Sequence, residues 1–201
     1  MEIDTSRLAA LPATAAWRHL GLRAGFEIAH FSTSNRDGMT RLWGNSLIVE
    51  DGVGYAVTYS VSVDENWKTR EATIETHTRV ATRTTQLLRD EGGGWTVDGR
   101  ARPDLAGCID IDLEASLVTN TLPIHRLVEN PGTYAVKAAY VQLDCTAGVL
   151  DQTYDIPVIG ASRFSCAYTA PRFDFTADLH YDETGLILDY PGLATREPVG
   201  A

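Results

Sequence analysis

Large apolar residues alternate with small or polar residues most regularly in the stretch Val53–Val63. Every second position there is valine or tyrosine, and this period of two is typical of one face of a β-strand. The next stretch, residues 67–83, is rich in threonine and alternates in the same way. After a turn at residues 64–66, the two stretches are therefore expected to pair as antiparallel neighbours.

Further strands are predicted along the rest of the chain. A hairpin is expected from residues 84–89 and 95–98, because Gly92, Gly93 and Gly94 between them suit a turn that needs positive φ angles. The remaining predicted strands are residues 108–113, 134–143, 152–158, 163–169, 173–181 and 186–190. A helical pattern is found only at residues 5–11, after a helix-capping residue.

These elements predict a mainly β fold with at most one or two short helices. Many antiparallel strands joined by tight turns favour a barrel-like or half-barrel sheet, in which curling protects the strand edges. A chain of 201 residues is long enough for one well-buried core, so we expect a single domain over residues 1–201.

The net charge of the chain argues against two classes of binding partner. The formal net charge is -10, which repels nucleic-acid phosphates and anionic lipid surfaces, so neither nucleic acid nor membrane insertion is expected. Residues 1–21 contain Glu2 and Asp4 and have no sustained apolar core, so they predict no secretion signal, and we expect a cytoplasmic protein. Self-association as a homodimer is left open.

Residues 108–113 contain two carboxylates that are candidate functional groups. Alternation places Asp110 and Asp112 on one face of the predicted strand, about 6.6 Å apart along the backbone. Their repulsion is about 2.5 kcal/mol at an effective dielectric near 20 but about 0.6 kcal/mol in water. The pair is therefore either a solvated strand face or a pocket wall with a countercharge, namely Arg70, Arg126 or a divalent metal.

Two other segments offer polar or aromatic contacts. Thr119, Asn120 and Thr121 precede a proline, and this composition predicts either a structural loop or a rim of hydrogen-bond donors with Arg126 as an anion clamp. Trp67 and Arg70 combine an aromatic platform with a cation that could stack on a sugar or hold an acidic head group, although they could equally pack together. The sequence has no G-x-S-x-G, H-E-x-x-H, Walker A or G-x-G-x-x-G motif, so no catalytic residue and no cofactor are predicted.

Several of these motifs resemble a bacterial family whose members are described as "putative glycolipid-binding". The resemblance lies mainly in residues 107–113 (GCIDIDL) and 119–127 (TNTLPIHRL), and it extends to residues 17–18, 25–27, 38–47, 67–70, 185–193 and 196. It implies a curled β fold with a pocket, and it implies no particular reaction. His125 stands where the family tends to have a second arginine, which argues against a doubly cationic anion site here.

Three functions remain as hypotheses. The first is binding of a glycolipid or similar amphiphile in a barrel-like pocket, with Trp67, Arg70, Asp110, Asp112, Thr119, Asn120, Thr121 and Arg126 as ligand-binding residues. The second is a metal-dependent hydrolase of phosphoester-type substrates that uses Asp110 and Asp112. The third is a non-catalytic interaction protein, which an exposed apolar patch would indicate.

Overall fold

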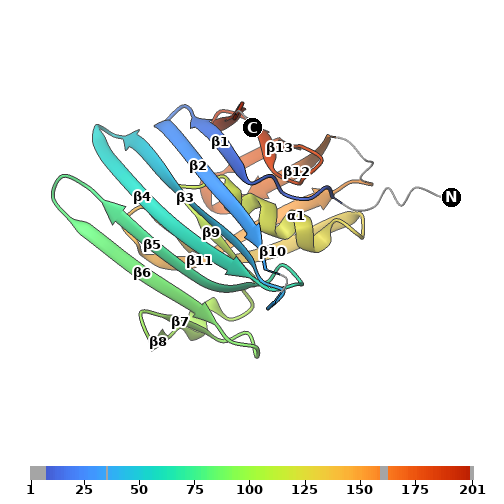
Figure 1. The fold of residues 1–201 in the computed structure, drawn as a ribbon, viewed down its shortest axis with the longest axis horizontal. Helices are drawn as coiled ribbons and strands as arrows, with labels where there is room; N and C mark the ends of the chain where they lie inside the picture. The colour runs from blue at the N-terminus through green and yellow to red at the C-terminus, as the bar shows by residue number, and fades with distance from the viewer. Residues whose placement is uncertain (1–7, 35, 159–162, 200–201) are drawn as a thin grey trace.

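One continuous sheet dominates the structure, a computed structural model that describes residues 8–34, 36–158 and 163–199 (Figure 1). Its strands are β1 (Thr14–His19), β2 (Arg23–Thr33), β3 (Thr40–Glu50), β4 (Val53–Val63), β5 (Thr69–His77), β6 (Thr82–Arg89), β7 (Trp95–Val97), β8 (Arg100–Ala101), β9 (Asp110–Leu113), β10 (Gly132–Val141), β11 (Ala147–Ile156), β12 (Phe164–Ala170), β13 (Phe175–Tyr181), β14 (Ile187–Tyr190) and β15 (Ala194–Glu197). The helical elements are α1 (Thr121–Leu127) and the 3-10 turns η1 (Pro103–Leu105), η2 (Val118–Asn120) and η3 (Pro171–Phe173).

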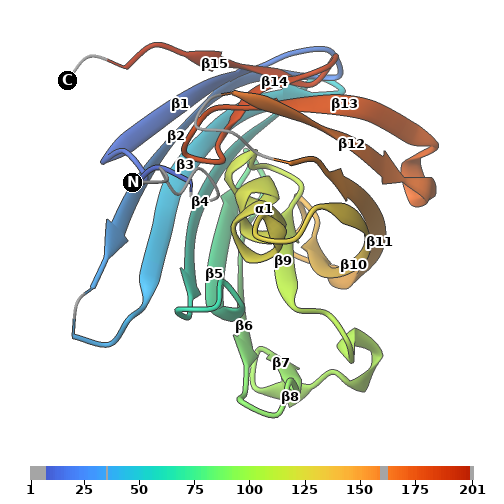
Figure 2. The same cartoon turned by 90° about the vertical axis from the view of Figure 1, so that its right-hand side faces the viewer.

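The sheet runs in the order β8-β7-β6-β5-β4-β3-β2-β1-β15-β14-β13-β12-β11-β10-β9. Neighbouring strands are antiparallel except for β9 and β10, which are parallel. The sheet curls around α1, which lies in its hollow (Figure 2). The predicted mainly β, barrel-like or half-barrel architecture is therefore confirmed.

The edge strand β9 lies close to the opposite half of the sheet. The backbone N–H of Thr69 donates to the carbonyl of Ile109 at 3.2 Å, and the N–H of Ile111 donates to the Thr69 hydroxyl at 3.0 Å. These two bonds link β5 to β9 without a continuous ladder. Because β9 is covered on both sides, Ile111 and Asp110 are both buried even though alternation points them to opposite faces.

Three expectations about local structure need correction. The stretch predicted as one strand over residues 67–83 is β5, a turn and the start of β6. The polar segment at residues 119–123, for which a loop was predicted, is helical and belongs to η2 and α1. The helix tolerates Pro123 because it falls in the first turn of α1, where its missing N–H is not needed. Residues 8–11 form no helix, and the rest of the helix predicted at residues 5–11 lies outside the described residues.

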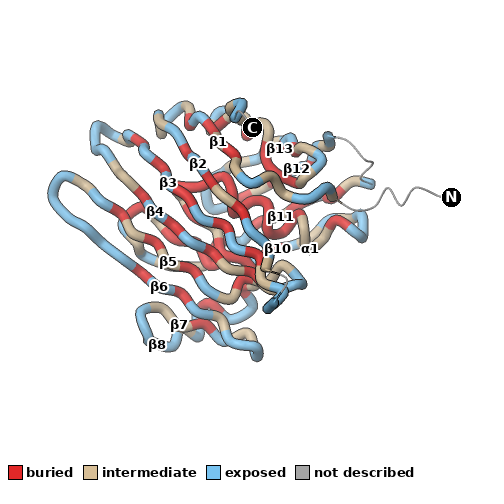
Figure 3. The backbone as a smooth tube through the Cα atoms, in the orientation of Figure 1, coloured by how far each residue is buried: buried red, intermediate tan, exposed pale blue. Residues whose placement is uncertain are grey.

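Buried residues alternate with exposed residues along the strands, so the core lies on the inner face of the curled sheet (Figure 3). Trp17 on β1 is fully buried, and its indole N–H donates to the carbonyl of Ile187 at 2.8 Å, which fixes β1 against β14. Within the described part of the chain, α1 is the longest helix, and none is long and apolar enough to cross a bilayer.

Candidate functional site

The inner cavity is a pocket of about 290 Å³ between the curled strands. Its wall draws on strands from both halves of the sheet and on the segment that links β9 to α1. The lining residues are His19, Leu22, Arg23, Glu50, Asp112, Leu113, Glu114, Ser116, Leu117, Asn120, Tyr140, Leu150, Tyr168, Ala170, Phe173, Phe175, Tyr190 and Leu193. Sites for small ligands typically combine mainly apolar walls with a few polar groups in this way.

Aromatic rings form one wall of the inner cavity. The rings of Tyr168, Phe175 and Tyr190 contact one another, with centroids 5.5 to 6.2 Å apart. Such edge-to-face and tilted pairs stabilise one another beyond the area they bury. The wall is therefore a packed surface that can receive an apolar group with little rearrangement.

Two exposed apolar side chains mark the opening of the inner cavity. Leu22, in the turn between β1 and β2, is 79% exposed, and Phe173, at the end of η3, is 48% exposed. Arg172 beside Phe173 places its guanidinium over the ring of Tyr140, 5.6 Å from the centroid. The opening thus offers apolar contact to a chain that extends out of the cavity.

Asp112 supplies a carboxylate to the polar end of the cavity. Its Oδ1 accepts a hydrogen bond from the Thr119 hydroxyl at 3.1 Å, and its Oδ2 accepts one from the Gln152 amide at 2.6 Å. Burial raises the pKa of Asp112 to about 6, against the lowering effect of these two bonds, and the nearby charges of Asp110 and Glu114 raise it further. Asp112 has no cationic partner among the described residues.

Arg23 is the one arginine among the residues lining the inner cavity, and each of its three side-chain nitrogens already bonds a glutamate. Its Nε donates to Glu50 at 3.1 Å, its Nη1 to the carbonyl of Glu114 at 2.9 Å, and its Nη2 to the Glu114 carboxylate at 2.5 Å. The guanidinium therefore ties β2 and β3 to the segment after β9. Two carboxylates therefore already balance its charge, which leaves little attraction for an anionic ligand.

The floor of the cavity is fixed by the buried carboxylate of Glu27 on β2. Glu27 accepts hydrogen bonds from the Tyr59 hydroxyl at 2.6 Å, from the Leu117 backbone N–H at 2.8 Å and from the Ser116 hydroxyl. Ser116 and Leu117 line the cavity, so this carboxylate holds part of the wall in place. His19, another lining residue, has its Nε2 atom 3.5 Å from Glu27.

Gly44 on β3 makes the contact between Tyr59 and Glu27 possible. Tyr59 lies on β4, directly opposite Gly44, and its side chain crosses β3 to reach Glu27 on β2. A Cβ at position 44 would lie 2.6 Å from the Tyr59 hydroxyl oxygen and 2.3 Å from the carbonyl oxygen of Ile28. Glycine is needed here because of this close approach rather than because of its φ angle.

Asp110 and Arg126 form an ion pair next to the inner cavity. The Arg126 guanidinium, on α1, bonds both carboxylate oxygens of Asp110, with Nε 3.3 Å from Oδ1. Burial raises the pKa of Asp110, and the charge of Arg126 opposes that rise. The countercharge expected for the acidic pair is therefore present at one aspartate and absent at the other.

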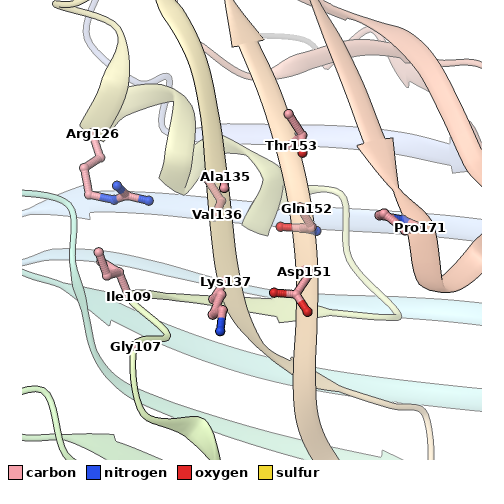
Figure 4. Close-up of a pocket in the computed structure, with 10 residues that line it drawn as sticks. All are labelled: Gly107, Ile109, Arg126, Ala135, Val136, Lys137, Asp151, Gln152, Thr153 and Pro171. Carbon is pink, nitrogen blue, oxygen red and sulfur yellow. The ribbon is translucent and has the colours of Figure 1, made fainter.

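Arg126 also borders a second hollow of about 330 Å³ (Figure 4). Lys137 on β10 and Asp151 on β11 lie opposite each other in register along this hollow, and both are exposed. The opposite charges of these two side chains and the ion pair of Arg126 leave no excess of positive charge. This hollow also has no aromatic side chain among the described residues that line it, so it offers less to an amphiphilic ligand than the inner cavity.

The polar residues of η2 and α1 mostly make structural contacts. Thr119 bonds Asp112, as above, and its hydroxyl also accepts the Leu113 N–H at 3.1 Å. Asn120 lines the cavity and accepts a bond from the Tyr154 hydroxyl at 3.2 Å. The Thr121 hydroxyl donates to the carbonyl of Gly185 at 3.0 Å, which anchors the helix to the turn before β14.

Trp67 and Arg70 lie away from the inner cavity. Trp67, whose φ of +58° is in the left-handed region, stacks its ring on His125 with centroids 3.7 Å apart. Arg70 bonds the Asp64 carboxylate at 2.8 Å and the carbonyl of Asp90 at 3.2 Å. The eight predicted ligand-binding residues therefore fall into three groups. Asp112 and Asn120 line the cavity, and Trp67 and Arg70 lie away from it. The other four support the cavity or lie beside it: Asp110, Thr119, Thr121 and Arg126.

The carboxylates were also candidates for a metal site. Both oxygens of Asp110 bond Arg126, and those of Asp112 bond two neutral donors. In the parts of the chain that are described, no three His, Cys, Asp or Glu side chains are grouped so that they could hold a metal ion. The described residues around β9 therefore do not provide the group of metal ligands that a metal-dependent hydrolase would need.

Most of the cavity wall was not predicted from the sequence. The sequence did not indicate the bonds of Arg23 to Glu50 and Glu114, those of Glu27 to Tyr59 and Ser116, or the contact between the rings of Tyr168 and Phe175. The available signal was Glu27 itself, a charged residue at an inward-facing position of a strand. The inward position of Glu27 can be recognised only once β2 itself has been predicted.

An apolar patch lies on the outer face of β2 and β3. This outer patch consists of Phe26, Ile28, Leu47 and Val49, each about half exposed or more. Phe26 and Leu47 are directly opposite each other in the ladder. Exposed apolar surface of this kind is a recognised sign of an interaction site.

Comparison with known proteins places the chain among β-rich proteins of related sequence. Residues 14–196 match the family described as "Putative glycolipid-binding". A crystal structure of a DUF1089 family protein from Pseudomonas aeruginosa is 31% identical, with a TM-score of 0.69 over 84% of this chain and 92% of that one. A β-barrel-like DUF1849 protein from Brucella abortus, 12% identical with a TM-score of 0.54 over 94% of this chain and 96% of that one, shares the fold. No curated protein matches the sequence.

Proposed function

The chain belongs to the family described as "Putative glycolipid-binding", and we propose that it binds a small amphiphilic molecule of the glycolipid type in the inner cavity. The observation that carries this proposal is the cavity itself, which combines an aromatic wall, a carboxylate at its polar end and an apolar opening. In this arrangement the polar head lies towards Asp112, and the apolar part lies along Tyr168 and Phe175 towards Leu22 and Phe173.

The volume of the inner cavity limits what it can enclose. At about 30 Å³ for each water-sized group, 290 Å³ holds on the order of ten non-hydrogen atoms. That is enough for one sugar ring, or for a small polar head with a short alkyl chain. A longer chain would leave through the opening between Leu22 and Phe173.

Apolar burial alone gives only weak binding. Burying eight methylene groups contributes about 6 kcal/mol, and association costs at least about 4 kcal/mol. The difference, about 2 kcal/mol, corresponds to a Kd weaker than about 1 mM. Polar contacts at the Asp112 end therefore have to supply the rest of the affinity and most of the specificity.

Calorimetric titration with octyl β-glucoside below its micelle concentration tests the proposal. We expect saturable binding, and we expect Ala170→Leu to weaken it by about tenfold or more, because residue 170 lines the cavity and the added carbons occupy part of it. Ala167→Leu is the matched control, since Ala167 lies on the same strand but is exposed. Absence of binding, or equal loss in both variants, would reject the proposal. Native mass spectrometry of the purified protein should also detect a bound amphiphile.

The outer patch favours self-association as a second candidate function. Two copies that meet through Phe26 and Leu47 would remove this apolar surface from water, and each buried Å² contributes about 25 cal/mol. Sedimentation velocity should then show a dimer that Leu47→Glu dissociates and Ala167→Glu, which adds the same charge at an exposed position of β12 away from the patch, does not. A monomer at all accessible concentrations would remove this candidate.

A further inference from the structure

Asp112 carries a charge that its own surroundings do not balance. Its neighbour Asp110 is paired with Arg126, whereas the bonds to Asp112 come from the neutral side chains of Thr119 and Gln152. The described residues place no arginine, lysine or histidine within ion-pair distance of Asp112. Asp112 is only partly exposed, and charges removed from water are usually paired, so a carboxylate that lines a cavity without a cation indicates a position where a ligand can supply one.

The rest of the cavity wall has the same sign of charge. Asp112, Glu114 and Glu50 line it, against the single guanidinium of Arg23, so the charged lining residues sum to two negative charges when His19 is neutral. Arg23 donates to Glu50 and to Glu114, so its charge is already balanced within the wall. An anionic head group at the Asp112 end would therefore meet repulsion, because the arginine nearest to it in the described wall is already paired; Arg172 lies at the opening, over Tyr140.

One further feature of the wall suits a positively charged group. Gln152 bonds both Asp112 and, at 2.9 Å, the hydroxyl of Tyr168, so an aromatic ring lies close to the carboxylate. Aromatic faces attract cations, most strongly where water is excluded.

We infer that the inner cavity selects ligands whose polar head carries a positive charge, an amine or ammonium that binds Asp112, over ligands with a neutral or an anionic head. The inference rests on the proposed function, because it names the head group that the cavity would take. It differs from the expectation drawn from Arg70 and Arg126, which pointed to an acidic head group. Arg70 and Arg126 pair instead with Asp64 and Asp110.

Three probes with the same tail separate the possible head groups. Octylamine, 1-octanol and octanoate have nearly the same size, on the order of the ten non-hydrogen atoms that the cavity can hold. Titration at about pH 7.5 keeps alkylamines protonated and Asp112 ionised. We expect octylamine to bind most tightly, at least about tenfold more tightly than octanoate, with 1-octanol between them.

Asp112→Asn tests whether the preference arises at this carboxylate. The carbonyl oxygen of the new asparagine can accept a hydrogen bond from Gln152, and its NH₂ group can donate one to the hydroxyl oxygen of Thr119. The side-chain contacts can therefore be kept while the charge is removed. We expect octylamine to lose about tenfold in affinity and 1-octanol to change by less than about twofold. Asp178→Asn, on the exposed face of β13, removes the same charge from the surface and should leave all three affinities unchanged.

The possible outcomes are distinct. If octanoate or 1-octanol binds as tightly as octylamine, or if Asp178→Asn acts as Asp112→Asn does, the inference is wrong and the proposed function stands. If none of the three probes and no octyl glucoside binds, the proposed function fails and the inference fails with it. The order of the three probes on the unmodified protein decides the question even if Asp112→Asn does not fold.

Discussion

Glu27→Gln tests whether one buried carboxylate holds the cavity floor. Glu27 is fully buried and accepts three hydrogen bonds, from Tyr59, Ser116 and Leu117. Hydrogen bonds to a charged group contribute about 1.5 to 3 kcal/mol each. Glutamine keeps the shape but offers one acceptor oxygen and places an NH₂ group against one of the donors. We expect a loss of about 2 to 4 kcal/mol, which is large beside a total stability of about 5 to 15 kcal/mol.

Urea unfolding followed by circular dichroism measures this loss as a lower midpoint at an unchanged slope. Tyr59→Phe removes one of the three bonds and should cost about 1 to 2 kcal/mol, and the double variant should lose less than the sum because the two side chains share that bond. Glu65→Gln, at an exposed position, is the control for the change of charge. If Glu27→Gln unfolds within about 0.5 kcal/mol of the unmodified protein, the carboxylate does not anchor the floor.

Two predictions concern pH. The pKa of Asp112 in the folded protein is raised to about 6, so the folded state binds the proton of this carboxyl more tightly than the unfolded state does. The contribution of Asp112 to the free energy of unfolding therefore falls as pH rises from about 4 to about 6. Asp112→Asn should therefore be more stable than the unmodified protein at pH 7, by up to about 3 kcal/mol, with the difference gone near pH 4; equal stability at both pH values would contradict this. Burial lowers the pKa of His125 to about 4, so its NMR titration should have a midpoint near that value and not near the ordinary 6.5.

The predicted fold is correct where the sequence alternates cleanly. Val53–Val63 was predicted with the bounds that β4 has, because its inward face is valine and tyrosine throughout. Three strands before it were missed. In β2 the inward positions include Glu27 and Ala29 while Phe26 and Ile28 face outward, and β3 turns Gly44 inward, so neither strand shows a simple apolar face.

The candidate site was only partly predictable for the same physical reason. The sequence indicated that Asp110 and Asp112 share a face and that burial would demand a cation. The pairing of Arg126 with Asp110, and not with Asp112, depends on how α1 lies in the hollow. Trp67 stacks on His125, a contact between residues 58 positions apart that no local pattern indicates.

The central claim is that a small amphiphile occupies the inner cavity, and a crystal structure of the protein with octyl β-glucoside tests it most directly. The account predicts density for the ligand inside the wall of Tyr168, Phe175 and Leu150, with its polar head towards Asp112 and its chain towards Phe173. A ligand bound only at the outer patch, or a cavity closed by rearranged side chains in the presence of saturating ligand, would contradict it.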